Sequence, residues 1–302
     1  MTRRLIMAKH AGFCFGVKRA VNAISEALEN NNDAQNSNVW TIGLPIHNPQ
    51  EVARLQAMGL KVANNADEIP DGAKIFIRAH GESLNVIESL KARNIEVVDM
   101  TCPFVKKAQD MAAELSQKDY HVVLLGDKNH PEIKGIKGHC KSEDSVQVIA
   151  GAGEIENINQ HQKIALISQT TQQEKNLSEV AGLLVKKCFE LHVCNTICRA
   201  TTERQNAVRE LVKNNVDGVI LIGGKASANT AKLQDIILKS GKPVLWVEDV
   251  KELREKISWL DEIAKTACCQ NLIGIAAGAS TPEWLIIDII NVVDAVTRGF
   301  DS

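Results

Sequence analysis

Six segments of the chain follow one plan: a short run of β-branched and aliphatic residues, a polar or glycine-containing turn, and then apolar residues at helical spacing. The runs begin at VWTIG, AKIFI, HVVLL, KIALI, GVILI and LIGIA. They are continuous and do not alternate with polar residues, which is typical of strands covered on both faces, as in a parallel sheet with helices on each side. Repetition of strand, turn and helix predicts an α/β fold.

Three cysteines mark a coarser repeat. Cys14, Cys102 and Cys198 lie about 90–100 residues apart, and each directly precedes a segment with helical periodicity and basic residues. After Cys14, for example, the apolar residues from Val17 to Leu28 fall on one helical face. The repeat predicts three α/β units, each the size of a small domain and each entered through a cysteine at a helix start.

These three cysteines are suited to bind a metal centre. The positive end of a helix stabilises a thiolate, which is the form that binds metal. Ligands of open α/β sheets lie beyond the carboxyl ends of the strands, so three units facing one axis would bring the thiolates together. They could hold zinc with a fourth ligand, or an iron–sulfur cluster with one iron not bound by cysteine. The wide spacing favours a [4Fe–4S] cluster, since structural zinc sites usually contain close cysteine pairs.

The composition excludes several classes of function. The chain has 35 basic and 37 acidic residues and a net charge of −2, so neither nucleic acid nor an anionic membrane is expected as a partner. It shows no signal-peptide core and no apolar run long enough for a membrane span. We therefore predict a cytoplasmic protein, in which disulfides are rare. The remaining cysteines are predicted to pack in the core: Cys140, Cys188, Cys194, Cys268 and Cys269.

Polar residues gather in the turns where predicted strands end and helices begin. Histidines, hydroxyls and an amide occupy these turns: His47, His80, His130, Thr170, Ser227, Asn229 and Ser280. Such residues can cap helices, but the N–H groups at a helix start also bind phosphate. The set favours a diphosphate-sized anion, and the lack of a Walker A or G-x-G-x-x-G motif disfavours a nucleotide. Glu132 is the carboxylate among these turns, either an acid held protonated by burial or an ordinary first-turn glutamate.

Taken together, these motifs resemble the LytB/IspH family of 4-hydroxy-3-methylbut-2-enyl diphosphate reductases over essentially the whole chain. The motifs are AGFCFGVKRAV, GLPIHNP, RAHG, DMTCPFV, GDKNHPEIKG, SQTT, TICRATTERQNA, GGKASANT and AGASTPEW. The resemblance implies pseudo-threefold-related α/β units with mostly parallel sheets around a central iron–sulfur cluster. The implied units are 15–101, 102–196, and 197–302 completed by residues 1–14.

The resemblance also implies roles for individual residues. Cys14, Cys102 and Cys198 would hold one [4Fe–4S] cluster with an open iron site, and Glu132 would supply a proton with help from Thr170. The substrate would be bound by His47, His80, His130, Thr170, Ser227, Ala228, Asn229 and Ser280. At Ala228 the sequence departs from many relatives, which carry a second serine there. Because its serine and asparagine neighbours are kept, we expect a modest effect on affinity and no loss of reaction.

The implied reaction is reductive dehydroxylation, the last step of the methylerythritol phosphate route to isoprenoids. Two electrons from a ferredoxin or flavodoxin would convert 4-hydroxy-3-methylbut-2-enyl diphosphate to isopentenyl and dimethylallyl diphosphate, in an enzyme that we expect to be a monomer. Two alternatives stay open: another three-cysteine cluster enzyme, such as a quinolinate synthase-like dehydratase, and a non-catalytic iron–sulfur sensor. The reductase needs a reductant, whereas the dehydratase does not. The reductase binds an allylic diphosphate, whereas the sensor does not.

Overall fold

The structure is a computed structural model that describes residues 4–30, 37–266 and 271–298. Within these ranges the strands form three four-stranded sheets, and every neighbouring pair of strands is parallel. The predicted α/β class with parallel sheets is thereby confirmed. The chain packs into two compact units: the first contains residues up to 17, 46–54 and from 199 onward, and the second contains 18–45 and 55–198. Among the described helices, none combines the length and the apolar character needed to span a bilayer.

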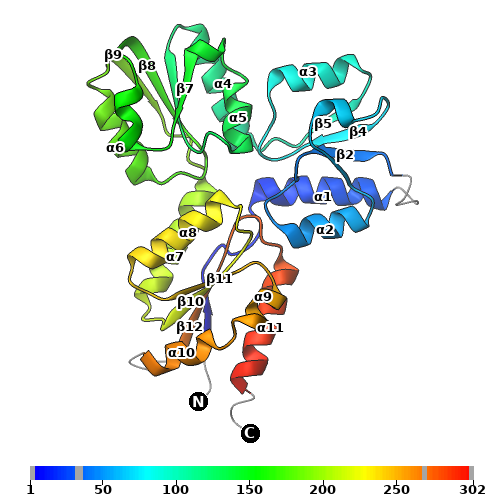
Figure 1. Ribbon diagram of the computed structural model, residues 1–302, viewed down its shortest axis with the longest axis vertical. Helices are drawn as coiled ribbons and strands as arrows, with labels where there is room; N and C mark the ends of the chain where they lie inside the picture. Colours follow the sequence, from blue (N-terminus) through cyan, green and yellow to red (C-terminus); the bar gives the residue numbers. More distant parts are fainter. Residues whose placement is uncertain (1–3, 31–36, 267–270, 299–302) are drawn as a thin grey trace. The chain divides into compact units, whose positions relative to one another are not determined.

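The first unit contains one sheet, sheet A. Its strand order is β1 (Arg4–Met7), β12 (Leu272–Ala277), β10 (Gly218–Ile222) and β11 (Val244–Val247). One face is covered by α7 (Arg199–Lys213) and α8 (Ala228–Lys239), and the other by α9 (Val250–Glu255), α10 (Trp259–Thr266) and α11 (Glu283–Arg298) (Figure 1). Because helices cover both faces, the inner strands β10 and β12 are almost fully buried, which accounts for their continuous apolar sequences.

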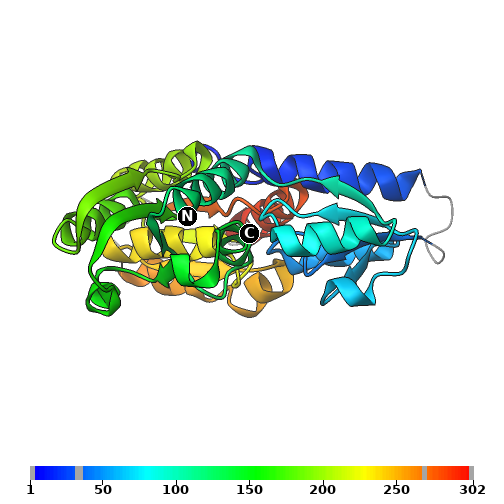
Figure 2. The same cartoon turned by 90° about the horizontal axis from the view of Figure 1, so that it is seen from above.

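The second unit contains sheets B and C. Sheet B has the order β3 (Lys61–Ala63), β2 (Val39–Ile42), β4 (Lys74–Ile77) and β5 (Glu96–Asp99). Side chains of α1 (Phe15–Glu29) and α2 (Pro49–Ala57) pack on one face. The other face is covered by η1 (Ala66–Glu68) and α3 (Leu84–Ala92) (Figures 1 and 2). The predicted apolar face of α1 is confirmed, since Ile24 and Leu28 are buried against this sheet.

Sheet C has the order β7 (Val146–Ile149), β6 (His121–Leu125), β8 (His161–Ser168) and β9 (Cys188–Cys194). Helices α4 (Pro103–Gln117) and α5 (Pro131–Lys137) cover one face, and α6 (Glu174–Leu184) with η3 (Ala152–Asn157) covers the other. The short η2 (Glu143–Ser145) leads into β7. As in sheet A, the two inner strands are the most buried.

The three sheets share one arrangement of strands when β1 is counted after β12 in sheet A, and this arrangement fixes where the predicted site residues lie. In each sheet one edge strand ends shortly before a predicted cluster ligand: β1 before Cys14, β5 before Cys102 and β9 before Cys198. The inner strands end before the other predicted residues, which are His47 and His80 for sheet B, His130 and Thr170 for sheet C, and Ser227, Asn229 and Ser280 for sheet A. In parallel sheets all these loops lie at the carboxyl edge. The division into three separate domains stays a prediction.

Candidate active site

A buried carboxyl group lies at the carboxyl edge of sheet C. Glu132, in the first turn of α5, is 2% exposed. The Thr170 N–H donates to its Oε1 at 2.6 Å, and the Thr170 hydroxyl donates to its Oε2 at 2.8 Å. Burial raises the pKa of Glu132 to about 7, and the two Thr170 hydrogen bonds oppose this rise only in part. The carboxyl group can therefore hold a proton near neutral pH, which is the property a proton donor needs.

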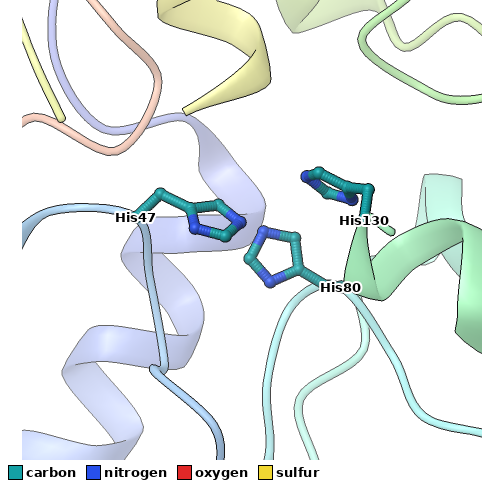
Figure 3. Close-up of side chains that lie close together, drawn as sticks. All are labelled: His47, His80 and His130. Carbon is teal, nitrogen blue, oxygen red and sulfur yellow. The ribbon is translucent and has the colours of Figure 1, made fainter. Parts of the chain in front are cut away.

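Two histidine rings lie together in the same unit. His130 is the N-cap of α5, and its Nδ1 accepts a hydrogen bond from the Glu132 N–H at 3.1 Å. A neutral His130 therefore carries its proton on Nε2, which is able to donate to a ligand. The His80 ring, on the β4–α3 loop, lies edge to face with the His130 ring at a centroid distance of 5.3 Å (Figure 3). His47, labelled in the same figure, belongs to the first unit.

Gln169 joins the two loops that carry Glu132 and Thr170. Its side chain is buried, and its Oε1 accepts a hydrogen bond from the Asp127 N–H at 3.1 Å. A glycine at position 126 allows this approach, because a Cβ atom on Gly126 would lie 2.8 Å from that oxygen. The β6–α5 and β8–α6 loops are thus fixed against each other. Sequence reasoning misses this residue, since a lone glutamine carries no motif signal.

Backbone hydrogen bonds hold both predicted cluster cysteines of the second unit. The Cys102 N–H donates to the carbonyl of Ala79 at 3.0 Å, directly before His80. The Cys198 N–H donates to the carbonyl of Thr170 at 3.0 Å. Both cysteines are half-buried, and α4 and α7 begin at the residues that follow them, which confirms the predicted helix starts. Each thiol is therefore tied to a loop that carries a predicted substrate or proton-donor residue.

The first unit repeats this arrangement at Cys14. The Cys14 N–H donates to the carbonyl of Ala279 at 3.0 Å, directly before Ser280, and α1 begins at the next residue. The Ser280 hydroxyl donates to the carbonyl of His47 at 3.2 Å. Gly224, in the β10–α8 loop, packs against the same carbonyl, since a Cβ atom there would lie 2.3 Å from its oxygen. Two loops at the carboxyl edge of sheet A thereby fix the backbone of His47.

The start of α8 carries the remaining predicted substrate ligands. The Ser227 hydroxyl caps the helix by accepting a hydrogen bond from the Thr230 N–H at 3.3 Å, and Ala228 is the first helical residue. Asn229 is 5% exposed, yet neither atom of its amide has a hydrogen-bond partner among the described residues. Leaving a buried amide without a partner is costly. This amide therefore fits a polar ligand at the helix start, where phosphate groups commonly bind.

The chemistry of the cysteines separates them into two groups. Cys140, Cys188 and Cys194 pack against the apolar clusters of sheet C, and burial raises the pKa of each, that of Cys140 to about 11. Their contacts with these clusters confirm that they pack, and the raised pKa values make them poor thiolates. The three predicted ligands instead lie half-buried at helix starts, and this all-thiol donor set fits an iron–sulfur cluster. The other predicted packing residues, Cys268 and Cys269, lie outside the described residues.

The predicted site residues divide equally between the two units. The first unit contains Cys14, His47, Ser227, Ala228, Asn229 and Ser280. The second unit contains His80, Cys102, His130, Glu132, Thr170 and Cys198. In the second unit a connected set of contacts joins the acid, the two histidine rings and the loop of one cysteine. The roles of all these residues stay predictions.

The chain is similar to known proteins along almost its whole length. A Campylobacter hominis protein named 4-hydroxy-3-methylbut-2-enyl diphosphate reductase is 40% identical over 294 residues, which are 97% of this chain and 99% of that protein. A solved structure titled as (E)-4-hydroxy-3-methyl-but-2-enyl diphosphate reductase, the terminal enzyme of the non-mevalonate pathway, is 36% identical with a TM-score of 0.69, and the match covers 98% of this chain and 100% of that one. A Plasmodium falciparum structure, titled as E-1-hydroxy-2-methyl-but-2-enyl-4-diphosphate reductase, shares the fold at 24% identity, with a TM-score of 0.85 and coverage of 97% and 88%.

One protein family accounts for these similarities. The family described as LytB protein matches residues 5–294, a range that contains every predicted site residue. The resemblance identified from the sequence motifs is thereby confirmed. The chain belongs to the LytB family, a family of iron–sulfur enzymes.

Proposed function

We propose that this protein is an iron–sulfur reductase that converts 4-hydroxy-3-methylbut-2-enyl diphosphate to isopentenyl diphosphate and dimethylallyl diphosphate. One observation carries the proposal beyond the family match. Glu132 is an acid able to hold a proton near neutral pH. Its carboxyl group accepts from the Thr170 N–H, and the Thr170 carbonyl accepts from the Cys198 N–H. The backbone N–H of Glu132 donates to the His130 ring. A proton donor is thus linked to a proposed cluster ligand on one side and to a proposed phosphate ligand on the other.

The proposed cofactor is a [4Fe–4S] cluster held by Cys14, Cys102 and Cys198. When bound, such a cluster supplies electrons one at a time and an open iron that acts as a Lewis acid on the substrate's oxygen. The three cysteines fit this task because their backbone N–H groups are each fixed by a carbonyl of a neighbouring loop. We infer that a ferredoxin or flavodoxin is the electron source.

The diphosphate is proposed to bind to hydrogen-bond donors at helix starts. The buried Asn229 amide has no partner among the described residues and can donate, and the Ser227 hydroxyl can donate while it caps α8. We propose the His130 ring as a third donor, through Nε2, because its Nδ1 accepts from the Glu132 N–H. We propose His47, His80, Thr170, Ala228 and Ser280 as further contacts. At Ala228 only the backbone N–H is offered, since the side chain lacks a hydroxyl.

Removal of the substrate's hydroxyl group as water consumes two electrons and two protons. Glu132 supplies the first proton to the departing oxygen. The Thr170 N–H and hydroxyl then stabilise the carboxylate that forms, because both already donate to its two oxygens. The second proton adds to either end of the three-carbon allylic unit. One position gives isopentenyl diphosphate and the other gives dimethylallyl diphosphate.

The proposal is tested on protein purified without oxygen. We would record the visible absorption and iron content, and then add the hydroxylated allylic diphosphate with reduced methyl viologen. Brown protein with about four irons that oxidises the dye only when substrate is present supports the reductase. Colourless protein would point to zinc or a plain thiol protein. Brown protein without substrate-dependent oxidation would point to a dehydratase or a sensor.

A matched pair of variants tests the proton donor. Glu132→Gln should keep the iron content and greatly slow dye oxidation, because the amide cannot give up a proton to the departing oxygen. Glu179→Gln removes a carboxylate from the exposed face of α6 and should leave the rate unchanged. A Glu132→Gln variant with near-normal turnover would remove this residue from the proposed acid role.

A further inference from the structure

The Arg19 guanidinium holds the loop in front of Cys102. Arg19 is half-buried on α1, and its Nη2 donates to the carbonyl of Thr101 at 2.6 Å. The Thr101 N–H in turn donates to Oδ1 of Asp99 at 2.8 Å. Together with the bond from the Cys102 N–H to Ala79, these contacts fix the backbone on both sides of Thr101. They therefore set the direction in which the Cys102 side chain leaves the loop.

The first unit contains the same kind of contact. Arg204, on α7, is 6% exposed, and its Nη2 donates at 2.6 Å to the carbonyl of Gly12, in the loop that carries Cys14. Its Nη1 donates to the carbonyl of Ala200 at 3.1 Å, which holds the guanidinium in place. Gly12 has a φ of 91°, and a Cβ atom there would lie 3.3 Å from Ile286. The loop thus adopts a backbone shape that suits only glycine, with a buried arginine bound to it.

The charge of Arg19 lies against the loop that leads into Cys102. Its Nε is buried and has no hydrogen-bond partner among the described residues. A buried donor without a partner is costly, and a positive charge partly removed from water is stabilised by negative charge nearby. Two groups on this loop can supply negative charge: the Asp99 carboxyl group, which accepts from the Thr101 N–H, and Cys102, the residue after the acceptor, whose thiolate would bind the proposed cluster. Lys18, the preceding residue on the same helix, is exposed and carries its charge in solvent.

We propose that Arg19 and Arg204 are positioning residues for the metal centre: they fix the loops of Cys102 and Cys14, and their positive charges favour the reduced state of the cluster. This inference rests on the proposed function. Reduction adds negative charge to a cluster, and a fixed positive charge in a partly desolvated site stabilises that added electron. The two guanidinium groups should therefore raise the reduction potential.

The charge effect is measured by redox titration of the anaerobically purified protein, followed by electron paramagnetic resonance. Arg19→Gln should shift the midpoint potential to a more negative value. Arg19→Lys keeps the charge and should shift it less. The matched control, Lys18→Gln, removes the same charge from an exposed neighbour and should leave the potential unchanged. Equal potentials for Arg19→Gln and the wild type, or equal shifts for Arg19→Gln and Lys18→Gln, would overturn the charge effect.

The positioning effect is measured by hydrogen exchange of the peptide that spans residues 100–106. Losing a hydrogen bond from a charged donor should speed exchange there about tenfold or more in both Arg19→Gln and Arg19→Lys, but not in Lys18→Gln. If Arg19→Gln does not fold, Arg19→Lys carries this test alone. Unchanged exchange in Arg19→Lys would overturn the positioning role. A wild-type protein that binds no cluster would overturn the proposed function, and the charge effect with it. A wild-type protein that binds a cluster, with Arg19 variants that change neither the potential nor the exchange rate, would overturn this inference alone.

Discussion

The proton on Glu132 should make the stability of the protein depend on pH in a way that one substitution removes. Burial raises the pKa of Glu132 from 4.5 to about 7. Between these two values the folded protein therefore keeps a proton that the unfolded chain releases. Folding stability falls with pH wherever the native state binds more protons than the unfolded state. The free energy of unfolding should thus decrease as pH rises from about 4.5 to about 7, and level off above that range.

The size of this effect follows from the shift in pKa. One pKa unit corresponds to about 1.4 kcal/mol, so a rise from 4.5 to about 7 corresponds to about 3 kcal/mol of lost stability at alkaline pH. Because the unfolded chain is already partly ionised at pH 5, the part measurable between pH 5 and pH 8 is about 2–3 kcal/mol. The group is buried almost completely, so solvent screening does not reduce this value much.

The assay compares Glu132→Gln with the wild type by denaturant unfolding at pH 5 and pH 8. Glutamine has the shape of the protonated acid and cannot ionise, so the variant should gain about 2–3 kcal/mol relative to the wild type between the two pH values. All other titrating groups are shared and cancel in the comparison. Glu179→Gln, on the exposed face of α6, should show no such gain.

A pH-independent difference between Glu132→Gln and the wild type would refute this reasoning. It would mean that Glu132 is ionised in the folded protein across the whole range, with Thr170 donating to a carboxylate. A gain of opposite sign would mean that the hydrogen bonds outweigh burial. In either case the carboxyl group would hold no proton near neutral pH, and its proposed role as the acid would fail with the stability prediction.

Three further predictions concern the same site. Thr170→Val removes the hydroxyl that donates to Glu132 and should raise the carboxyl pKa above about 7. The infrared band of the protonated carboxyl group should then persist to higher pH than in the wild type, and Thr170→Ser, which keeps a hydroxyl, should restore the wild-type pKa. Ala228→Ser adds a hydroxyl at the start of α8 and should lower KM for the diphosphate a few-fold, within about tenfold, at unchanged kcat; an unchanged KM would place this position off the substrate. Cys102→Ser should lose most bound iron and colour, whereas Cys188→Ser, at a packing position, should keep both.

The sequence predicts the inner strands of the fold better than its edges. The six continuous apolar runs correspond to β2, β4, β6, β8, β10 and β12, which are the two inner strands of each sheet. An inner strand has helices on both faces of the sheet and a neighbouring strand along each edge, so nearly every residue must be apolar. The edge strands carry no such signal: β5 has exposed ends, and β9 exposes Phe189 and Val193. Their place in the sheets depends on pairing with strands that the local sequence does not specify.

The same division holds for the candidate site. Motifs indicate the residue types and the helix starts, because caps and turns are local features. They do not indicate that the Cys102 N–H binds the carbonyl of Ala79, since that contact exists only when β4 and β5 are paired. In the sequence, Arg19 and Lys18 are two members of one basic patch; burial alone separates a loop-binding guanidinium from a solvated amine. Gln169 is likewise recognisable only from its hydrogen bond.

Sheet A differs from the other two sheets because its edge strand comes from the opposite end of the chain. β1 pairs with β12, and the Cys14 N–H bonds to the carbonyl of Ala279, just after that strand. Closing so long a loop costs entropy that is recovered only when β12 is in place. The amides of Cys102 and Cys198, by contrast, find their acceptors within 55–198. During synthesis the Cys14 loop therefore obtains its partner last, and a partly folded chain presents two of the three proposed thiolate ligands. If all three cysteines hold the cluster, as proposed, bound iron should reach its full level only after β1 has paired with β12.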